Sequence, residues 1–277
     1  MPIDPETRRA PNWLLLSILI ALLPWSWVVN IWFVDGRYYE PLLHASRGLL
    51  HPSMQVCLPT ILALLLLFRV AGLAPRDVGL KASKLPAGVL ATLLLWLAVN
   101  AVALASTGGE LVWSDHEGRS GPLVLGHLLG QFLGNAFFEE LVYRGLFLAQ
   151  LVLLLRSRGR GATRAAWTAA LLSAVIFAVP HIPNRIMKEA YDGPLSVVAD
   201  QGRLVASGLL LAWIYLRTQN LWWAIGLHGL ANYPTVLLDW DYRASPKEVV
   251  VLFTLVMTLV WPWVARRDDR GGRVPAD

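Results

Sequence analysis

The sequence predicts an all-α, polytopic integral membrane protein with about eight transmembrane helices. Its 277 residues are 56% hydrophobic and only 16% charged, and the mean hydropathy is +0.51. Soluble domains carry charges on about a quarter of their residues. The apolar residues also gather in stretches of the length that a membrane-crossing helix needs. Composition and patterning therefore agree on a membrane protein.

Eight apolar stretches are long enough, or nearly so, to cross a bilayer: about 12–34, 53–72, 86–106, 121–155, 163–181, 203–217, 221–238 and 247–265. The first stretch follows two arginines, but it is too long for a signal peptide and lacks a cleavage site, so we expect a retained anchor. The fourth is too long for a single span, so we expect it to tilt or to project beyond the membrane. The sixth, about 15 residues, is short.

The loop charges predict an orientation in the cell membrane. With the N-terminus in the cytoplasm, the predicted cytoplasmic segments hold more Lys and Arg than the opposite ones. The positive-inside rule then places both termini of this multi-pass chain in the cytoplasm, with the lipid bilayer as its surroundings. The net charge of +5 does not predict a nucleic-acid partner, because the basic residues are scattered over short loops.

The fourth stretch carries three charges, Glu139, Glu140 and Arg144. Each costs roughly 2.5–3.5 kcal/mol at the bilayer centre unless it is compensated. Glu140 and Arg144 are four residues apart, so they share a helix face and are expected to pair. Glu139 points about 100° away and has no cation in its own helix. It is either a spare carboxylate beside a structural ion pair or a general base that the pair orients.

In the same stretch, Gly126, Gly130 and Gly134 recur every four residues and line one helix face. Small residues at this spacing let another helix approach closely, so we interpret the three glycines as scaffold.

Two further polar groups follow in later stretches. Pro180 precedes His181 at the end of the fifth stretch and should kink or end that helix. His228 and Asn232 in the seventh stretch are four residues apart and share a face. Alone, each group has an ordinary structural explanation, an interfacial histidine in one case and an interhelical hydrogen-bond pair in the other.

Together, the motifs resemble the CAAX protease and bacteriocin-processing family of intramembrane endopeptidases. They are Glu-Glu-x-x-x-Arg at 139–144, Phe-x-x-x-His at 177–181 and His-x-x-x-Asn at 228–232, in this order along the chain. The resemblance covers residues 121–238, which we interpret as a CAAX-protease-like catalytic core within a single membrane domain, 1–277.

The resemblance implies an intramembrane cavity in which a peptide bond of a membrane-associated or lipidated protein or peptide is hydrolysed. Glu139 and His181 would activate the attacking water, and His228 and Asn232 would stabilise the oxyanion, without a cofactor. Glu140, Arg144 and Phe177 would support the site. Peptide hydrolysis needs such a base and such donors, and both act more strongly in a low-dielectric cavity.

Two alternatives stay open. Glu139, His181 and His228 could form a three-ligand catalytic zinc site, although no His-Glu-x-x-His helix is present. The chain could also be a non-catalytic membrane protein that acts in immunity, scaffolding or transport, since intramembrane charges suit such roles as well.

One expectation conflicts with a shared site. Counted from the predicted inner ends of their spans, His181 lies about 18 positions along and His228 about 7. At 1.5 Å per residue the two histidines would differ by roughly 15 Å in depth. The polar stretch of about 182–202 that follows His181 is expected to be a loop.

Overall fold

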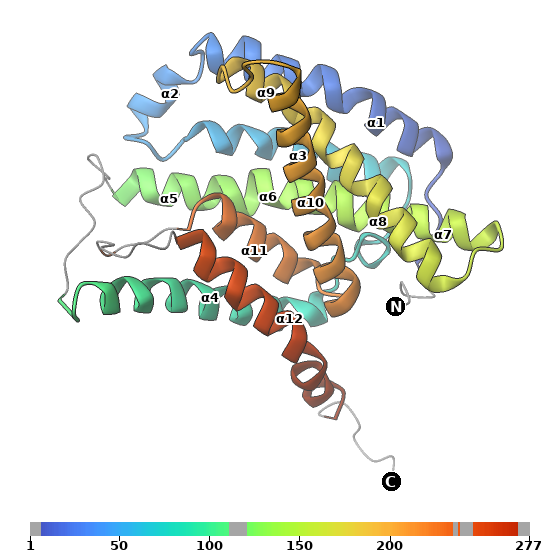
Figure 1. Ribbon diagram of the computed structural model, residues 1–277. Coiled ribbons are helices and arrows are strands. Elements are labelled where there is room, and N and C mark those ends of the chain that lie inside the picture. Colours follow the sequence, from blue (N-terminus) through green and yellow to red (C-terminus); the bar gives the residue numbers. More distant parts are fainter. Residues whose placement is uncertain (1–6, 111–120, 235–237, 239–245, 271–277) are drawn as a thin grey trace.

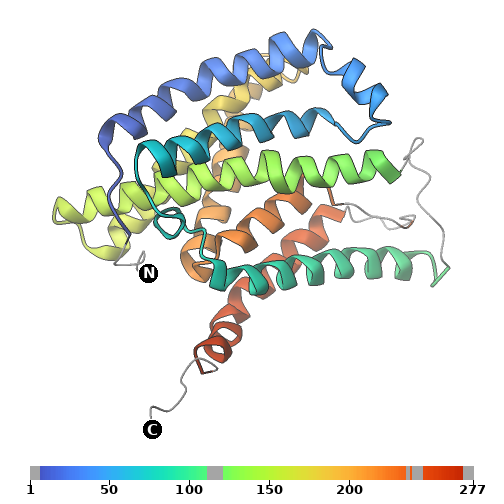
Figure 2. The same ribbon diagram turned by 180° about the vertical axis from the view of Figure 1, so that it is seen from behind.

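The computed structural model describes residues 7–110, 121–234, 238 and 246–270, and every regular element in these ranges is a helix (Figures 1 and 2). The all-α prediction is confirmed. The N-terminal half contains α1 (Asn12–Trp27), η1 (Val28–Asp35), α2 (Glu40–Ala45), η2 (Pro52–Val56), α3 (Cys57–Leu65), η3 (Leu66–Val70), η4 (Pro75–Val78), η5 (Ala82–Lys84) and α4 (Leu85–Ser106).

The second half contains α5 (Gly121–Leu129), η6 (Gly130–Asn135), α6 (Ala136–Glu139), η7 (Glu140–Leu148), α7 (Ala149–Ser157), α8 (Ala162–Ala178), η8 (Val179–His181), α9 (Ile182–Met187), α10 (Pro194–Thr218), α11 (Leu221–Asn232) and α12 (Pro246–Arg270). From α5 to α7 the chain is continuously helical, and its segments η6 and η7 are π-helical. π-Helical turns inside α-helices are frequent at functional sites.

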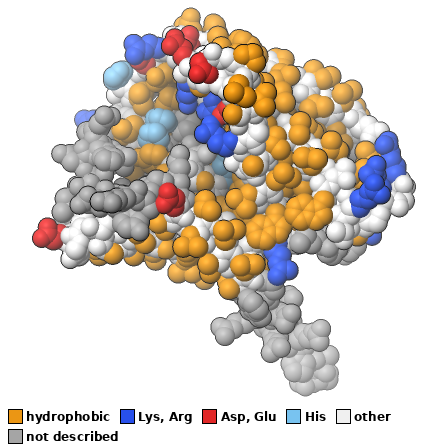
Figure 3. All heavy atoms as spheres, in the orientation of Figure 1, with side chains coloured by type: hydrophobic (Ala, Val, Ile, Leu, Met, Phe, Trp, Pro, Cys, Tyr) orange, Lys and Arg blue, Asp and Glu red, His pale blue; other side chains and the backbone are white. Residues whose placement is uncertain are grey.

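Five helices among the described residues are long and apolar enough to cross a membrane. They are Asn12–Asp35, Pro52–Val70, Ala82–Ser106, Ala162–Met187 and Pro194–Thr218. Large apolar side chains are exposed on the outward faces, as with Leu16, Leu90 and Leu252, and Figure 3 shows them covering much of the surface. Water disfavours so wide an apolar surface, whereas lipid accommodates it. The protein is therefore a polytopic membrane protein, and the cytoplasmic placement of its termini stays a prediction.

Two stretches differ from the expected helices. The expected loop 182–202 is wrong, because α9 and the start of α10 occupy most of it, and α10 is 25 residues long instead of about 15. The seventh stretch holds a helix of only 12 residues, α11. It ends because Pro234 forces the preceding Tyr233 into an extended conformation, with φ −144° and ψ 91°. Residues 235–237 of this stretch lie outside the described ranges.

The glycine face of the long helix packs against the backbone of residues 48–57, as expected from its small side chains. A Cβ atom built at Gly126 would lie 2.5 Å from the carbonyl oxygens of Gly48 and Leu49. One built at Gly134 would lie 2.7 Å from the carbonyl oxygen of Ser53. These glycines therefore hold η2 and the start of α3 against the helix that carries Glu139.

We expect Gly134→Ala to lower the free energy of unfolding by about 1–3 kcal/mol, because the new methyl group would clash with rigid backbone. The matched control is Gly202→Ala in α10, where nothing lies within 4 Å of the added Cβ atom. Thermal unfolding in detergent measures both variants. Equal midpoints for the two variants would contradict the close approach.

The N-terminal segment is fastened to the rest of the chain by Arg8 and Asp77. The Arg8 Nε atom lies 2.9 Å from Asp77 Oδ2, and the Arg8 amide donates to Asp77 Oδ1 over 3.0 Å. Burial by itself would raise the pKa of Asp77, but hydrogen bonds from the Arg8 and Ala74 backbone amides and the Arg8 guanidinium outweigh it and lower the pKa. Gln150 adds two hydrogen bonds, to the Ala10 amide and the Arg8 carbonyl. That residues 1–277 form one domain stays a prediction.

Candidate active site

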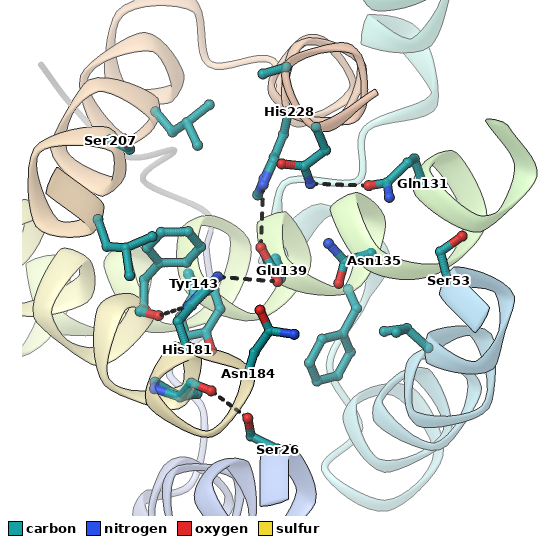
Figure 4. A pocket seen from close by; sticks show the side chains of 18 of the residues that line it. Ser26, Ser53, Gln131, Asn135, Glu139, Tyr143, His181, Asn184, Ser207 and His228 are labelled. Carbon is teal, nitrogen blue, oxygen red and sulfur yellow. Dashed lines mark hydrogen bonds and ion pairs between the residues drawn. The ribbon is translucent and has the colours of Figure 1, made fainter. Parts of the chain in front are cut away.

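A cavity of about 1040 Å³ lies among α1, η2, α6, α9, α10, α11 and α12. All four residues that the sequence predicts as catalytic line it: Glu139, His181, His228 and Asn232. They come from three separate parts of the chain, at α6, at η8 and at the end of α11. Figure 4 shows that Glu139 lies between the two histidines and that the side chains of Asn135 and Asn184 face the same space.

Glu139 is the centre of this group. Its Oε2 atom lies 3.3 Å from His228 Nε2, and its Oε1 atom lies 3.9 Å from His181 Nε2. The side chain is 14% exposed. Oε2 is buried and accepts no hydrogen bond from the described residues. A buried carboxylate oxygen without a donor, facing a cavity, can take part in a hydrogen bond or a proton transfer with a molecule that enters.

His181 is oriented by its own helix. Its Nδ1 atom lies 2.9 Å from the Phe177 carbonyl oxygen, which can only accept, so Nδ1 carries the hydrogen and Nε2 faces Glu139. The α-helix ends at Ala178, as expected before a proline, but the chain continues helically through η8 and α9. Pro180 tightens one turn, and the Ser26 hydroxyl donates a hydrogen bond to its carbonyl oxygen. The expected break is therefore a local tightening.

His228 is oriented by a second carboxylate. Its Nδ1 atom lies 2.7 Å from Glu140 Oε1, and Glu140 is completely buried. Since a carboxylate only accepts, Nδ1 donates and Nε2 is directed to Glu139. The Arg144 Nη1 atom lies 2.9 Å from the same Glu140 oxygen. The predicted pairing of Glu140 with Arg144 is confirmed, whereas the contact of Glu140 with His228 was missed, because no spacing in the sequence reports a contact between two helices.

Arg144 and Phe177 pack behind the reactive groups. Arg144 is 1% exposed, and its Nη2 atom donates to the Gly208 carbonyl oxygen over 3.2 Å. Its guanidinium carbon lies 4.7 Å from the centre of the Phe177 ring, a cation–π geometry. The Phe177 ring also lies 4.7 Å from the His181 ring and lines the cavity. Arg144 thus balances the charge of Glu140 in a place that water does not reach.

Asn232 lies at the other side of the cavity. Its Nδ2 atom donates a hydrogen bond of 3.1 Å to Gln131 Oε1 (Figure 4). Gln131 and Asn135 line the cavity, and sequence reasoning missed both. They precede Glu139 by eight and four residues, which places all three on one helix face. This spacing was a signal that could have found them.

The conflict in depth between His181 and His228 does not exist in the structure. Both imidazoles approach one carboxylate, and the Phe177 and His228 rings are 6.1 Å apart. Residue counting failed because it placed the start of α11 at the membrane surface. Asn220, which precedes α11, is completely buried, and its side chain donates to the Lys84 carbonyl oxygen over 2.9 Å. The short helix α11 therefore begins inside the protein.

Glu139, His181 and His228 do not form a metal site in this arrangement. Within the parts of the chain that the structure describes, no three His, Cys, Asp or Glu side chains are placed so that they could hold a metal ion. The remaining arrangement is a carboxylate between two neutral-tautomer nitrogens in a polar pocket. Such a group can accept a proton from water and return it.

Comparison with known proteins supports the motifs. Residues 121–234 match the family model described as type II CAAX prenyl endopeptidase Rce1-like. The match, which spans under half of the chain, includes all four cavity residues above and confirms the resemblance that the motifs indicated. It indicates a membrane protease, a hydrolase. No curated protein and no solved structure matches the chain significantly.

Proposed function

Because residues 121–234 place this chain among the Rce1-like relatives of type II CAAX prenyl endopeptidases, we propose that it hydrolyses a peptide bond of a membrane-associated or lipidated protein or peptide. The attacking water is activated by Glu139 and His181. The observation that carries the proposal is the Glu139 carboxylate between the Nε2 atoms of His181 and His228, inside a cavity of about 1040 Å³.

The proton path follows from the hydrogen bonds. Glu139 takes a proton from a water molecule that the His181 Nε2 atom also holds, and the water oxygen attacks the scissile carbonyl carbon. The protonated Glu139 then gives that proton to the leaving amine as the carbon–nitrogen bond breaks. Atoms and protons balance, and the enzyme returns to its initial state.

Developing negative charge on the carbonyl oxygen needs donors. Asn232 uses one Nδ2 hydrogen for Gln131 and has a second one for the cavity. His228 can donate from Nε2 when it is protonated, and the buried Glu140 carboxylate at its Nδ1 atom stabilises that imidazolium. In a low-dielectric cavity each fixed donor lowers the barrier by about 2.7–4 kcal/mol. Glu140 and Arg144 therefore support catalysis through the orientation of His228.

The test is a cleavage assay with the purified protein in vesicles. The probe is a farnesylated peptide that ends in Cys-aliphatic-aliphatic-X, the sequence on which prenylation occurs. Mass spectrometry locates the cleaved bond. We expect cleavage that a histidine-to-alanine change at residue 181 strongly reduces. Cleavage that is unaffected by this change would contradict the assigned role of His181.

Zinc is the mechanistic alternative, with Glu139, His181 and His228 as its ligands. The two mechanisms differ in their response to chelators. We expect the cleavage rate to be unchanged after incubation with EDTA and with 1,10-phenanthroline. Complete inhibition that added zinc reverses would overturn the metal-free mechanism and establish the metalloprotease.

A further inference from the structure

The cavity wall has a second polar region at α9 and the start of α10. Arg185, Lys188 and Arg203, here called the cationic rim, all line the cavity. Figure 3 shows Lys, Arg, Asp and Glu side chains gathered over these elements, beside the apolar surface. Asp200 pairs with two members, at 3.3 Å from Arg185 Nε and 2.5 Å from Arg203 Nη2. The rim thus holds three positive charges against one paired carboxylate.

Lys188 is the member with spare capacity. Among the described residues it has no hydrogen-bond or ion-pair partner. Partial burial of the amine and the nearby Arg185 guanidinium lower the pKa of Lys188. Since nearby positive charge disfavours the protonated amine, an anion bound beside it would be attracted by both cations.

The spacing between the rim and the reactive groups is set by one helix. His181, Arg185 and Lys188 follow each other at four and three residues, and all three line the cavity. Seven residues of helix extend about 10 Å. An extended peptide covers about 3.3–3.6 Å per residue. A chain with its scissile carbonyl at Glu139 therefore reaches the cationic rim about three to four residues away.

We propose that the cationic rim binds a carboxylate that the substrate chain carries about three to four residues from the scissile bond. The carboxylate belongs either to the C-terminus of the substrate or to an Asp or Glu side chain. This inference rests on the proposed peptidase function and specifies its substrate class. Charge-assisted hydrogen bonds from Lys and Arg are the usual means by which proteins hold such a group.

The experiment uses a peptide library with the full-length protein in vesicles of neutral phosphatidylcholine. Each peptide is made prenylated and unprenylated, as the free acid and as the C-terminal amide, with and without Asp three or four residues from the end. We expect the wild-type protein to cleave carboxylate-bearing peptides with a kcat/KM about five- to tenfold higher than their neutral counterparts. Lys188→Glu should abolish or invert this ratio.

Arg160→Met is the matched control, because Arg160 is an exposed cation in the α7–α8 connection and does not line the cavity. It should leave the ratio at the wild-type value. Equal kcat/KM for charged and neutral peptides in the wild type, or an unchanged ratio in Lys188→Glu, would overturn the rim proposal while cleavage itself continued. A Lys188-dependent response to anionic lipid instead of peptide charge would also overturn it. Absence of any Glu139-dependent cleavage would refute the proposed function, and this inference with it.

Discussion

Replacement of Glu139 by glutamine is expected to reduce peptide hydrolysis by at least about 100-fold, the lower end of what a general base contributes. Glutamine keeps the size of the side chain and its hydrogen-bonding capacity but cannot accept a proton at neutral pH. The buried Oε2 atom, 3.3 Å from His228, is the atom whose basicity is lost. Initial rates of peptide cleavage in vesicles measure the effect.

The control for this variant is Glu110→Gln, since Glu110 is exposed and lies outside the cavity. It should cleave at the wild-type rate, and both variants should unfold at about the wild-type temperature. Cleavage by Glu139→Gln at the wild-type rate would remove Glu139 from the mechanism. A cellular phenotype that the inert variant still supplies would favour the non-catalytic alternative in immunity, scaffolding or transport.

Arg144→Met is expected to lower the free energy of unfolding by about 3–5 kcal/mol. The change removes the Nη1 contact of 2.9 Å to Glu140 and leaves a completely buried carboxylate without its strongest partner. It also removes the hydrogen bond to the Gly208 carbonyl oxygen on α10. The half-buried Cys57, the single cysteine of the chain, can report unfolding in detergent through a thiol-reactive dye.

Two further variants show whether the loss comes from the buried pair. Arg160→Met removes an exposed arginine and should change the free energy of unfolding by less than about 0.5 kcal/mol. The double variant Glu140→Gln/Arg144→Met leaves no unpaired charge, so it should be less destabilised than the sum of the single changes. Additive effects would show that the two residues do not stabilise each other.

The secondary structure was predictable wherever it depends on local spacing. Glu140 and Arg144 pair at 2.9 Å, as their separation of four residues predicts. Gly126 and Gly134 do meet neighbouring backbone. The length of α11 was not predicted, although Pro234 was a visible signal for its end, because a continuous apolar run outweighed a single breaker.

The sequence by itself determined the fold class, the membrane environment and the identity of the motifs, because hydropathy and helical periodicity are properties of neighbouring residues. Only the tertiary structure decided that Glu139 lies between His181 and His228 and that Glu140 is shared by Arg144 and His228. These contacts join helices that lie 40 to 90 residues apart in the chain, and they depend on the buried start of α11 and the helical continuation beyond Pro180. Such contacts are set by packing between helices, which leaves no periodic trace in the sequence.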